Sequence, residues 1–148
     1  MEHEFLAAEL FLKGYNCAQA ITVAFRDVTG LEESFSAKMA SSFGGGMGRL
    51  REVCGAVSGM LMVAGLIYGY DSTTDDAAKK AHYELVQELA GQFREEVGSI
   101  VCRDILKNPP SDPNPSPRTA EYYKNRPCAR MVMTAARILD RYLEEHPV

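Results

Sequence analysis

The chain has 148 residues, of which 46% are hydrophobic and 24% charged, and its net charge is −4. These values are typical of a soluble globular protein with one domain. The negative charge argues against a nucleic-acid partner, which would need a basic face.

The N-terminal third predicts short helices separated by glycines. Apolar residues recur at helical spacing over 2–14, and Gly14 ends the run. Asn16 then provides an N-cap for a helix that extends to about Asp27. A third, short helix is expected over about 34–42, directly before a run of glycines.

The segment from Val53 to Tyr70 contains no charged residue. Its length raises the question of a membrane span, but several glycines and a serine lower its hydrophobicity. A helix that is apolar all round is also typical of the centre of a helical protein. We therefore expect a buried, glycine-containing central helix and no membrane contact.

The C-terminal half predicts two longer helices on either side of a proline-rich loop. The first runs from about 75 to 97, and a segment of one or two turns follows over 100–106. Five prolines within 108–118 indicate an extended surface loop. The last helix should begin at Pro127, a residue favoured in the first turn.

Taken together, the periodic segments predict an all-α fold. No alternating strand pattern appears, and no internal repeat is evident. We expect residues 1–148 to form a single-domain bundle of five to seven helices around the central apolar helix.

Four cysteines stand at or near predicted helix starts. The first-turn N–H groups and the helix dipole stabilise an anion there, so a thiol at this position can have a lowered pKa. Thiolate is the form that attacks disulfides and binds metals. The four candidate catalytic or metal-ligating residues are Cys17, Cys54, Cys102 and Cys128.

The cysteine spacing limits which kind of site these residues can form. The intervals are 37, 48 and 26 residues, and there is no C-x-x-C pair. The pattern is therefore neither a thioredoxin-like motif nor a zinc-knuckle or ferredoxin spacing. If the thiols meet, folding must bring them together, either as ligands of an iron–sulfur cluster or zinc or as reversible disulfides.

A glycine run precedes Cys54 and has two interpretations. Its exposed backbone amides could contact an anion or cofactor, with Arg49 and Arg51 beside it, or approach the Cys54 sulfur. It could equally be a tight connection between helices. The candidate cofactor-binding glycines are Gly44, Gly45, Gly46, Gly48 and Gly55.

Other residue types give weaker signals. The three histidines are far apart in the sequence, and His3 and His146 lie near its ends. Tyr15 stands close to the first cysteine and Tyr122-Tyr123 close to the last, so these tyrosines are candidates to wall a site.

The cysteine blocks resemble a family of redox-active proteins named for the motif C…G-C-A-x-x-G…C…C. The matching blocks are G-Y-N-C-A-Q-A at 14–20, G-G-G-M-G-R-L-R-E-V-C-G-A-V-S-G at 44–59, and the last two cysteines. The central block reads C-G-A-x-x-G, with glycine after the cysteine instead of before it. The resemblance implies a redox role for the four cysteines as one set, and some relatives look like exported proteins with a prosthetic group such as an iron–sulfur cluster.

The leading hypothesis is a small redox protein, an oxidoreductase or an accessory of electron transfer. In its dithiol form Cys54 attacks and a second cysteine resolves; in its cluster form all four thiolates bind an iron–sulfur cluster or another metal. The alternatives are a non-redox zinc-binding or protein-interaction module and a helical domain with incidental cysteines.

The implied partner is a redox protein or oxidoreductase, and the sequence allows an oligomer. The acidic N-terminal stretch M-E-H-E-F does not resemble a leader, so a cytoplasmic location is expected.

Overall fold

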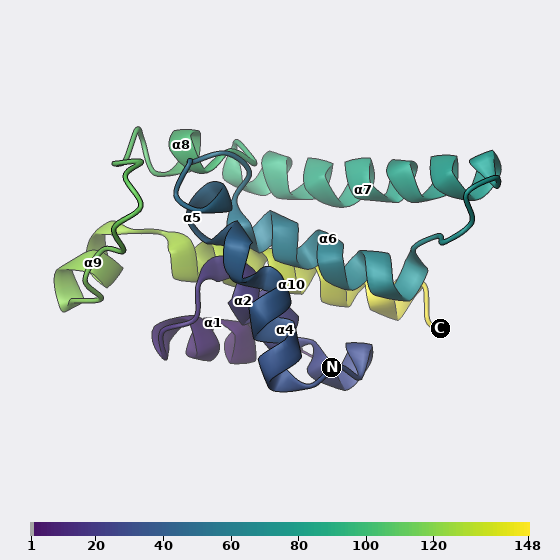
Figure 1. The fold of residues 1–148 in the computed structure, drawn as a ribbon, viewed down its shortest axis with the longest axis horizontal. Helices are drawn as coiled ribbons and strands as arrows, with labels where there is room; N and C mark the ends of the chain where they lie inside the picture. Colours follow the sequence, from purple (N-terminus) through teal and green to yellow (C-terminus); the bar gives the residue numbers. More distant parts are fainter. Residues whose placement is uncertain (1) are drawn as a thin grey trace.

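The structure, a computed structural model, describes residues 2–148 except for the side chain of Asn125. It confirms the all-α prediction, because helices joined by turns and loops make up the described chain (Figure 1). The helices are α1 (Glu4–Leu12), α2 (Cys17–Ala24), α3 (Arg26–Thr29), α4 (Glu33–Ala40), η1 (Ser41–Phe43), α5 (Gly44–Met47), α6 (Gly55–Tyr68), α7 (Asp76–Val97), α8 (Cys102–Ile105), α9 (Ala120–Asn125) and α10 (Cys128–Glu145).

The core lies where α1, α2, α6, α7 and α10 pack together. α2 is the most completely buried of them, with seven of its eight residues inside. α6 is the predicted glycine-containing helix, but it buries one face only, since Leu66 on its other side is 54% exposed. The long α10 contributes an inward stripe that includes Met131, Ile138 and Leu139.

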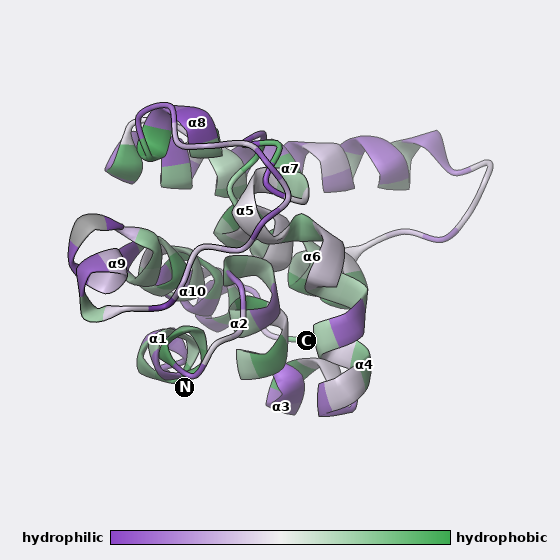
Figure 2. Cartoon of the chain, turned by 60° about the vertical axis from the view of Figure 1, so that its left-hand side comes forward, coloured by the Kyte–Doolittle hydropathy of each residue, from purple (hydrophilic) through white to green (hydrophobic). Residues whose placement is uncertain are grey.

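α7 covers the core as an amphipathic outer helix, as its charge pattern predicts. It buries Leu85, Leu89 and Phe93 and leaves its charged residues in solvent. Figure 2 shows hydrophilic and hydrophobic colours mixed along both α7 and α10, and a mainly hydrophobic colour on α2. Within the described chain, no helix is long and apolar enough to cross a membrane.

Several local details differ from the sequence-based expectation. The helix expected up to about Asp27 breaks at Phe25 and continues as the short α3. Pro127 is the N-cap residue of α10, one position before the expected first turn. The sequence does not predict the short α9, and within the part of the chain that the structure describes an antiparallel bridge pairs Val53 with Val101.

The loop from α8 to α9 contains the proline-rich segment and runs over the glycine turn of α5. Arg49 Nε donates to the carbonyl of Asp112 at 2.7 Å, and Arg51 Nε donates to the carbonyl of Pro110 at 2.8 Å. The loop is therefore exposed, as predicted, but it is also fixed to the segment that precedes Cys54.

Candidate functional site

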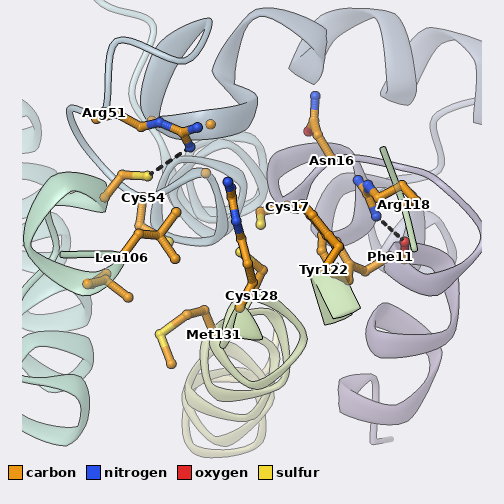
Figure 3. A pocket seen from close by; sticks show the side chains of 16 residues that line it. Phe11, Asn16, Cys17, Arg51, Cys54, Leu106, Arg118, Tyr122, Cys128 and Met131 are labelled. Carbon is orange, nitrogen blue, oxygen red and sulfur yellow. Dashed lines mark hydrogen bonds between the residues drawn. The ribbon is translucent and has the colours of Figure 1, made fainter. Parts of the chain in front are cut away.

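The four cysteines meet at one cavity although they are far apart in the sequence. Cys54 is the N-cap residue of α6, and the other three are the first residues of α2, α8 and α10. All four are buried and line a cavity of about 60 Å³, shown in Figure 3. The predicted placement at helix starts is confirmed, and folding does bring the thiols together.

A short backbone pairing holds the segments of Cys54 and Cys102 side by side. The Cys54 amide donates to the carbonyl of Ile100 at 2.7 Å, and the Cys102 amide donates to the carbonyl of Glu52 at 2.6 Å. These two bonds flank the Val53–Val101 bridge. The pairing fixes two cysteines that are 48 positions apart.

A capping box fixes the start of α2 and with it Cys17. The Asn16 side chain accepts a hydrogen bond from the Gln19 amide at 2.9 Å, and the Gln19 side chain accepts one from the Asn16 amide at 3.0 Å. Such reciprocal bonds satisfy two amides that would otherwise lack partners. The N-cap predicted at Asn16 is therefore confirmed.

The glycine run forms a left-handed turn that packs on the cysteine segments. Gly46 has φ +68°, and a Cβ added to it would lie 2.6 Å from the Cβ of Cys102. The non-glycine residues Met47, Arg49 and Arg51 share this left-handed backbone, with φ between +64° and +73°. Such conformations are strained for residues with a side chain and gather at functional sites.

Only part of the predicted glycine set lines the cysteine cavity. Gly45, Gly46 and Gly55 line it, Gly44 lines a neighbouring cavity, and Gly48 lines neither. A Cβ added to Gly55 would lie 3.1 Å from the Cβ of Cys17, so the missing side chain lets α6 approach α2 closely.

Cys128 is the thiol whose environment favours the thiolate. The neighbouring Cys17 thiol can donate a hydrogen bond to a Cys128 thiolate, and this is the main reason that the pKa of Cys128 falls to about 7 despite burial. The positive charges of Arg126, Arg118 and Arg51 lower it further. For Cys17 the same interaction, together with burial, raises the pKa well above its usual value.

The other two thiols stay protonated near neutral pH. Burial raises the pKa of Cys54 to about 12, although the amides of Ala56 and Val57 oppose the shift. Burial also raises the pKa of Cys102, against the hydrogen bond and charge of Arg51. The amides that act on Cys54 belong to α6, not to the glycine run as the sequence suggested. The lowered pKa therefore belongs to Cys128 and not to Cys54, and the attacking role predicted for Cys54 stays a prediction.

Arg51 closes the cavity next to Cys102. Its side chain is 2% exposed, and Nη1 donates to the Cys102 sulfur at 3.7 Å. Nη2 is buried and has no hydrogen-bond partner. The sequence suggested an arginine beside the glycine run, but not that it would be buried among thiols.

Two further arginines, Arg118 and Arg126, line the same cavity as Arg51. Sequence reasoning missed both. Arg118 donates to the backbone carbonyls of Phe11 and Tyr15 at 3.0 and 3.1 Å, and its guanidinium lies 5.2 Å from the ring centre of Tyr122. Arg126 lies 5.0 Å from the centre of the same ring. The signal available for Arg126 was its place two residues before Cys128. Tyr122 lines the cavity, as suggested, whereas Tyr15 touches the site only through Arg118.

The histidines lie outside the cysteine cavity. His3 is buried, with Nδ1 2.6 Å from Asp140 and Nε2 2.8 Å from Asp27, and it stacks on Phe25 at 4.0 Å. These contacts tie the start of the chain to α3 and α10. His3 is therefore part of the packing, which the sequence did not indicate.

The state of the four thiols bears on both the disulfide and the metal predicted from the sequence. The structure gives all four as free thiols. Among residues 2–148, no three histidine, cysteine or acidic side chains are grouped so that they could hold a metal ion. The iron–sulfur cluster or thiolate-bound metal therefore stays a prediction, and the chemistry proposed below uses the thiols alone.

Comparison with known proteins gives one match. The family model described as "Putative redox-active protein (C_GCAxxG_C_C)" matches residues 15–142, which include all four cysteines. Neither the curated proteins nor the solved structures give a match.

Proposed function

We propose that this chain, which belongs to the C_GCAxxG_C_C family, is a thiol–disulfide redox protein whose reacting pair is Cys128 and Cys17. One observation carries the proposal: within a cavity of four thiols, only the pKa of Cys128 is lowered, to about 7, and a neighbouring thiol is its main cause. A thiolate with a pKa near the ambient pH is the most effective attacking group in disulfide exchange.

The reaction has two steps. In the first, the Cys128 thiolate attacks one sulfur of a partner disulfide, forms a mixed disulfide and releases the other sulfur as a thiolate. In the second, Cys17 gives its proton to that thiolate and attacks the Cys128 sulfur, which releases the second partner sulfur as a thiolate. Two electrons pass from the cysteine pair to the partner, and a Cys17–Cys128 disulfide remains.

Cys54 and Cys102 do not react with the partner disulfide in this proposal. The raised pKa values of Cys54 and Cys102 keep both protonated, so that neither competes with Cys128 for the partner disulfide. The cytoplasmic location expected from the sequence would return the pair to its dithiol form, since that compartment keeps thiols reduced.

The proposal is tested by mapping the first disulfide to form. The reduced protein is treated with a limiting amount of hydroxyethyl disulfide, the remaining thiols are alkylated, and peptides are analysed by mass spectrometry. We expect a Cys17–Cys128 disulfide, its loss in Cys128→Ser, and its retention in Cys54→Ser. Cys54→Ser is the matched control because Cys54 is equally buried and lines the same cavity.

Two outcomes would contradict the proposal. A first disulfide that contains Cys54 and persists in Cys128→Ser would restore Cys54 as the nucleophile. Stoichiometric iron with sulfide, or zinc, in protein purified without oxygen would favour the thiolate-bound metal predicted from the sequence. Circular dichroism of each variant shows that the helical fold is retained.

A further inference from the structure

A second, outer cavity adjoins the cysteine cavity. Its volume is about 200 Å³, and it shares six lining residues with the inner one: Asn16, Gly45, Arg51, Arg118, Tyr122 and Arg126. Figure 3 shows Arg51 and Arg118 on either side of Cys128 and Cys17. The three shared arginines therefore stand between the outer cavity and the thiols.

The lining of both cavities is positive and contains no acidic residue. Four arginines line the two cavities, in a protein whose net charge is −4. Arg49 has a carboxylate 3.8 Å away, that of Asp112. Among the described residues, Arg51, Arg118 and Arg126 form no ion pair with a carboxylate. The Cys128 thiolate, whose pKa these three arginines lower, offsets one of their charges, and no carboxylate offsets the others within the described chain.

Arg51 is the clearest case of a buried charge that no carboxylate contacts within the described chain. A guanidinium stays charged at any pH that a protein experiences, and burying a charge is costly unless it is paired. Arg51 is almost fully buried, its polar contacts are a neutral carbonyl and a thiol, and its Nη2 has no partner. Its own backbone is left-handed, with φ +64°, so its position is also strained.

The N-terminal ends of three helices add partial positive charge to that of the arginines. α2, α6 and α10 each have eight or more residues, and their N-terminal ends place Cys17, Cys54 and Cys128 in the lining of the inner cavity. The N-terminal end of a helix carries partial positive charge and binds anions. Three such ends reinforce the three arginines.

From these observations we infer that the outer cavity binds an anionic group, such as a carboxylate, carried by a small disulfide that reacts at Cys128. The inference rests on the proposed function and adds the substrate class. Arg118 and Arg126 hold the anionic group in the outer cavity, where both also stack on Tyr122. The disulfide end then extends into the smaller inner cavity, where Arg51 and the cysteines lie.

The test compares three small disulfides of similar size and different charge: dithiodipropionate, hydroxyethyl disulfide and cystamine. The rate at which each oxidises Cys128 is measured at constant ionic strength and divided by its rate with a small thiol in solution. We expect the anionic disulfide to exceed the cationic one by at least about tenfold, the lower end of electrostatic enrichment in a charged cleft. The ratio of the two rates cancels any change in the fraction of Cys128 thiolate.

Variants that remove one positive charge show which arginines cause the preference for the anionic disulfide. Arg126→Gln should lower the anionic-to-cationic ratio of the rates severalfold. It is the milder variant because, among the described residues, the Arg126 side chain makes a single hydrogen bond, to Ser116. Arg118→Gln should do the same, with circular dichroism to check the fold. Arg130→Gln is the matched control, since Arg130 is exposed on α10 and lines neither cavity.

The outcomes separate the two proposals. A ratio near one, or a ratio that Arg126→Gln leaves unchanged, would overturn the anionic substrate class while the disulfide pair stands. If no disulfide oxidises the protein, the proposed function fails, and inorganic phosphate then tests the anion site alone. Phosphate should slow alkylation of Cys128 in the wild type more than in Arg126→Gln, and equal slowing in both would exclude the site.

Discussion

Replacing Gly46 by alanine tests how closely the glycine turn packs on the cysteine segments. The added Cβ would lie 2.6 Å from the Cβ of Cys102 and 2.8 Å from the Cα of Arg51, far inside van der Waals contact. Left-handed backbone costs a residue with a side chain about 1–2 kcal/mol. Overpacking against fixed neighbours costs about 1–3 kcal/mol more. The free energy of unfolding of Gly46→Ala should therefore fall by about 2–5 kcal/mol.

Gly48→Ala separates the two contributions. Gly48 has φ +58°, and the nearest atom to its added Cβ is the carbonyl oxygen of Ser42 at 4.0 Å. This variant should lose only the conformational part, about 1–2 kcal/mol. Urea denaturation followed by circular dichroism measures both variants under identical conditions. If Gly46→Ala were no less stable than Gly48→Ala, the close approach to Cys102 would not exist in solution.

Two further predictions concern the pH dependence of stability and the start of α2. Burial disfavours charged His3, but the carboxylates of Asp140 and Asp27 more than offset this and raise its pKa. Its stabilising contribution should therefore be complete below pH about 6.5 and decline as pH rises through the raised pKa. Urea titrations should show this decline in the wild type, and its persistence in His3→Asn would contradict the assignment. Asn16→Ala should cost about 1 kcal/mol, as should Asp75→Ala at the start of α7. Only Asn16→Ala should also slow formation of the disulfide, and an equal effect of both would refute a special role for the Asn16 cap.

Most of the fold can be predicted from local sequence patterns. The apolar spacing of α7 and α10 identifies their buried faces, as the burial of Leu89, Phe93 and Ile138 shows. Residues that cap or end helices are equally local, because Asn16 forms its capping box within four residues. The break at Phe25 has no such signal, and neither does the one-sided burial of α6, because each depends on neighbours distant in the sequence.

The candidate site is likewise predictable from the sequence only in its local features. That four cysteines stand at helix starts follows from the sequence, because the caps and breaks beside them are short-range features. Their meeting depends on long-range pairing such as the Val53–Val101 bridge. Sequence patterns at 26- to 48-residue intervals do not encode this pairing.

The sequence by itself therefore determined a helical chain with four thiols at helix starts and a glycine run before one of them. Only the tertiary structure decided which thiol has a lowered pKa, because the pKa of Cys128 depends on Cys17 and on arginines from other segments. The cause is that electrostatic interactions act through space and vary with burial. Arg51 illustrates the point: in the sequence it follows a flexible loop, whereas in the fold it is a buried charge facing the thiols.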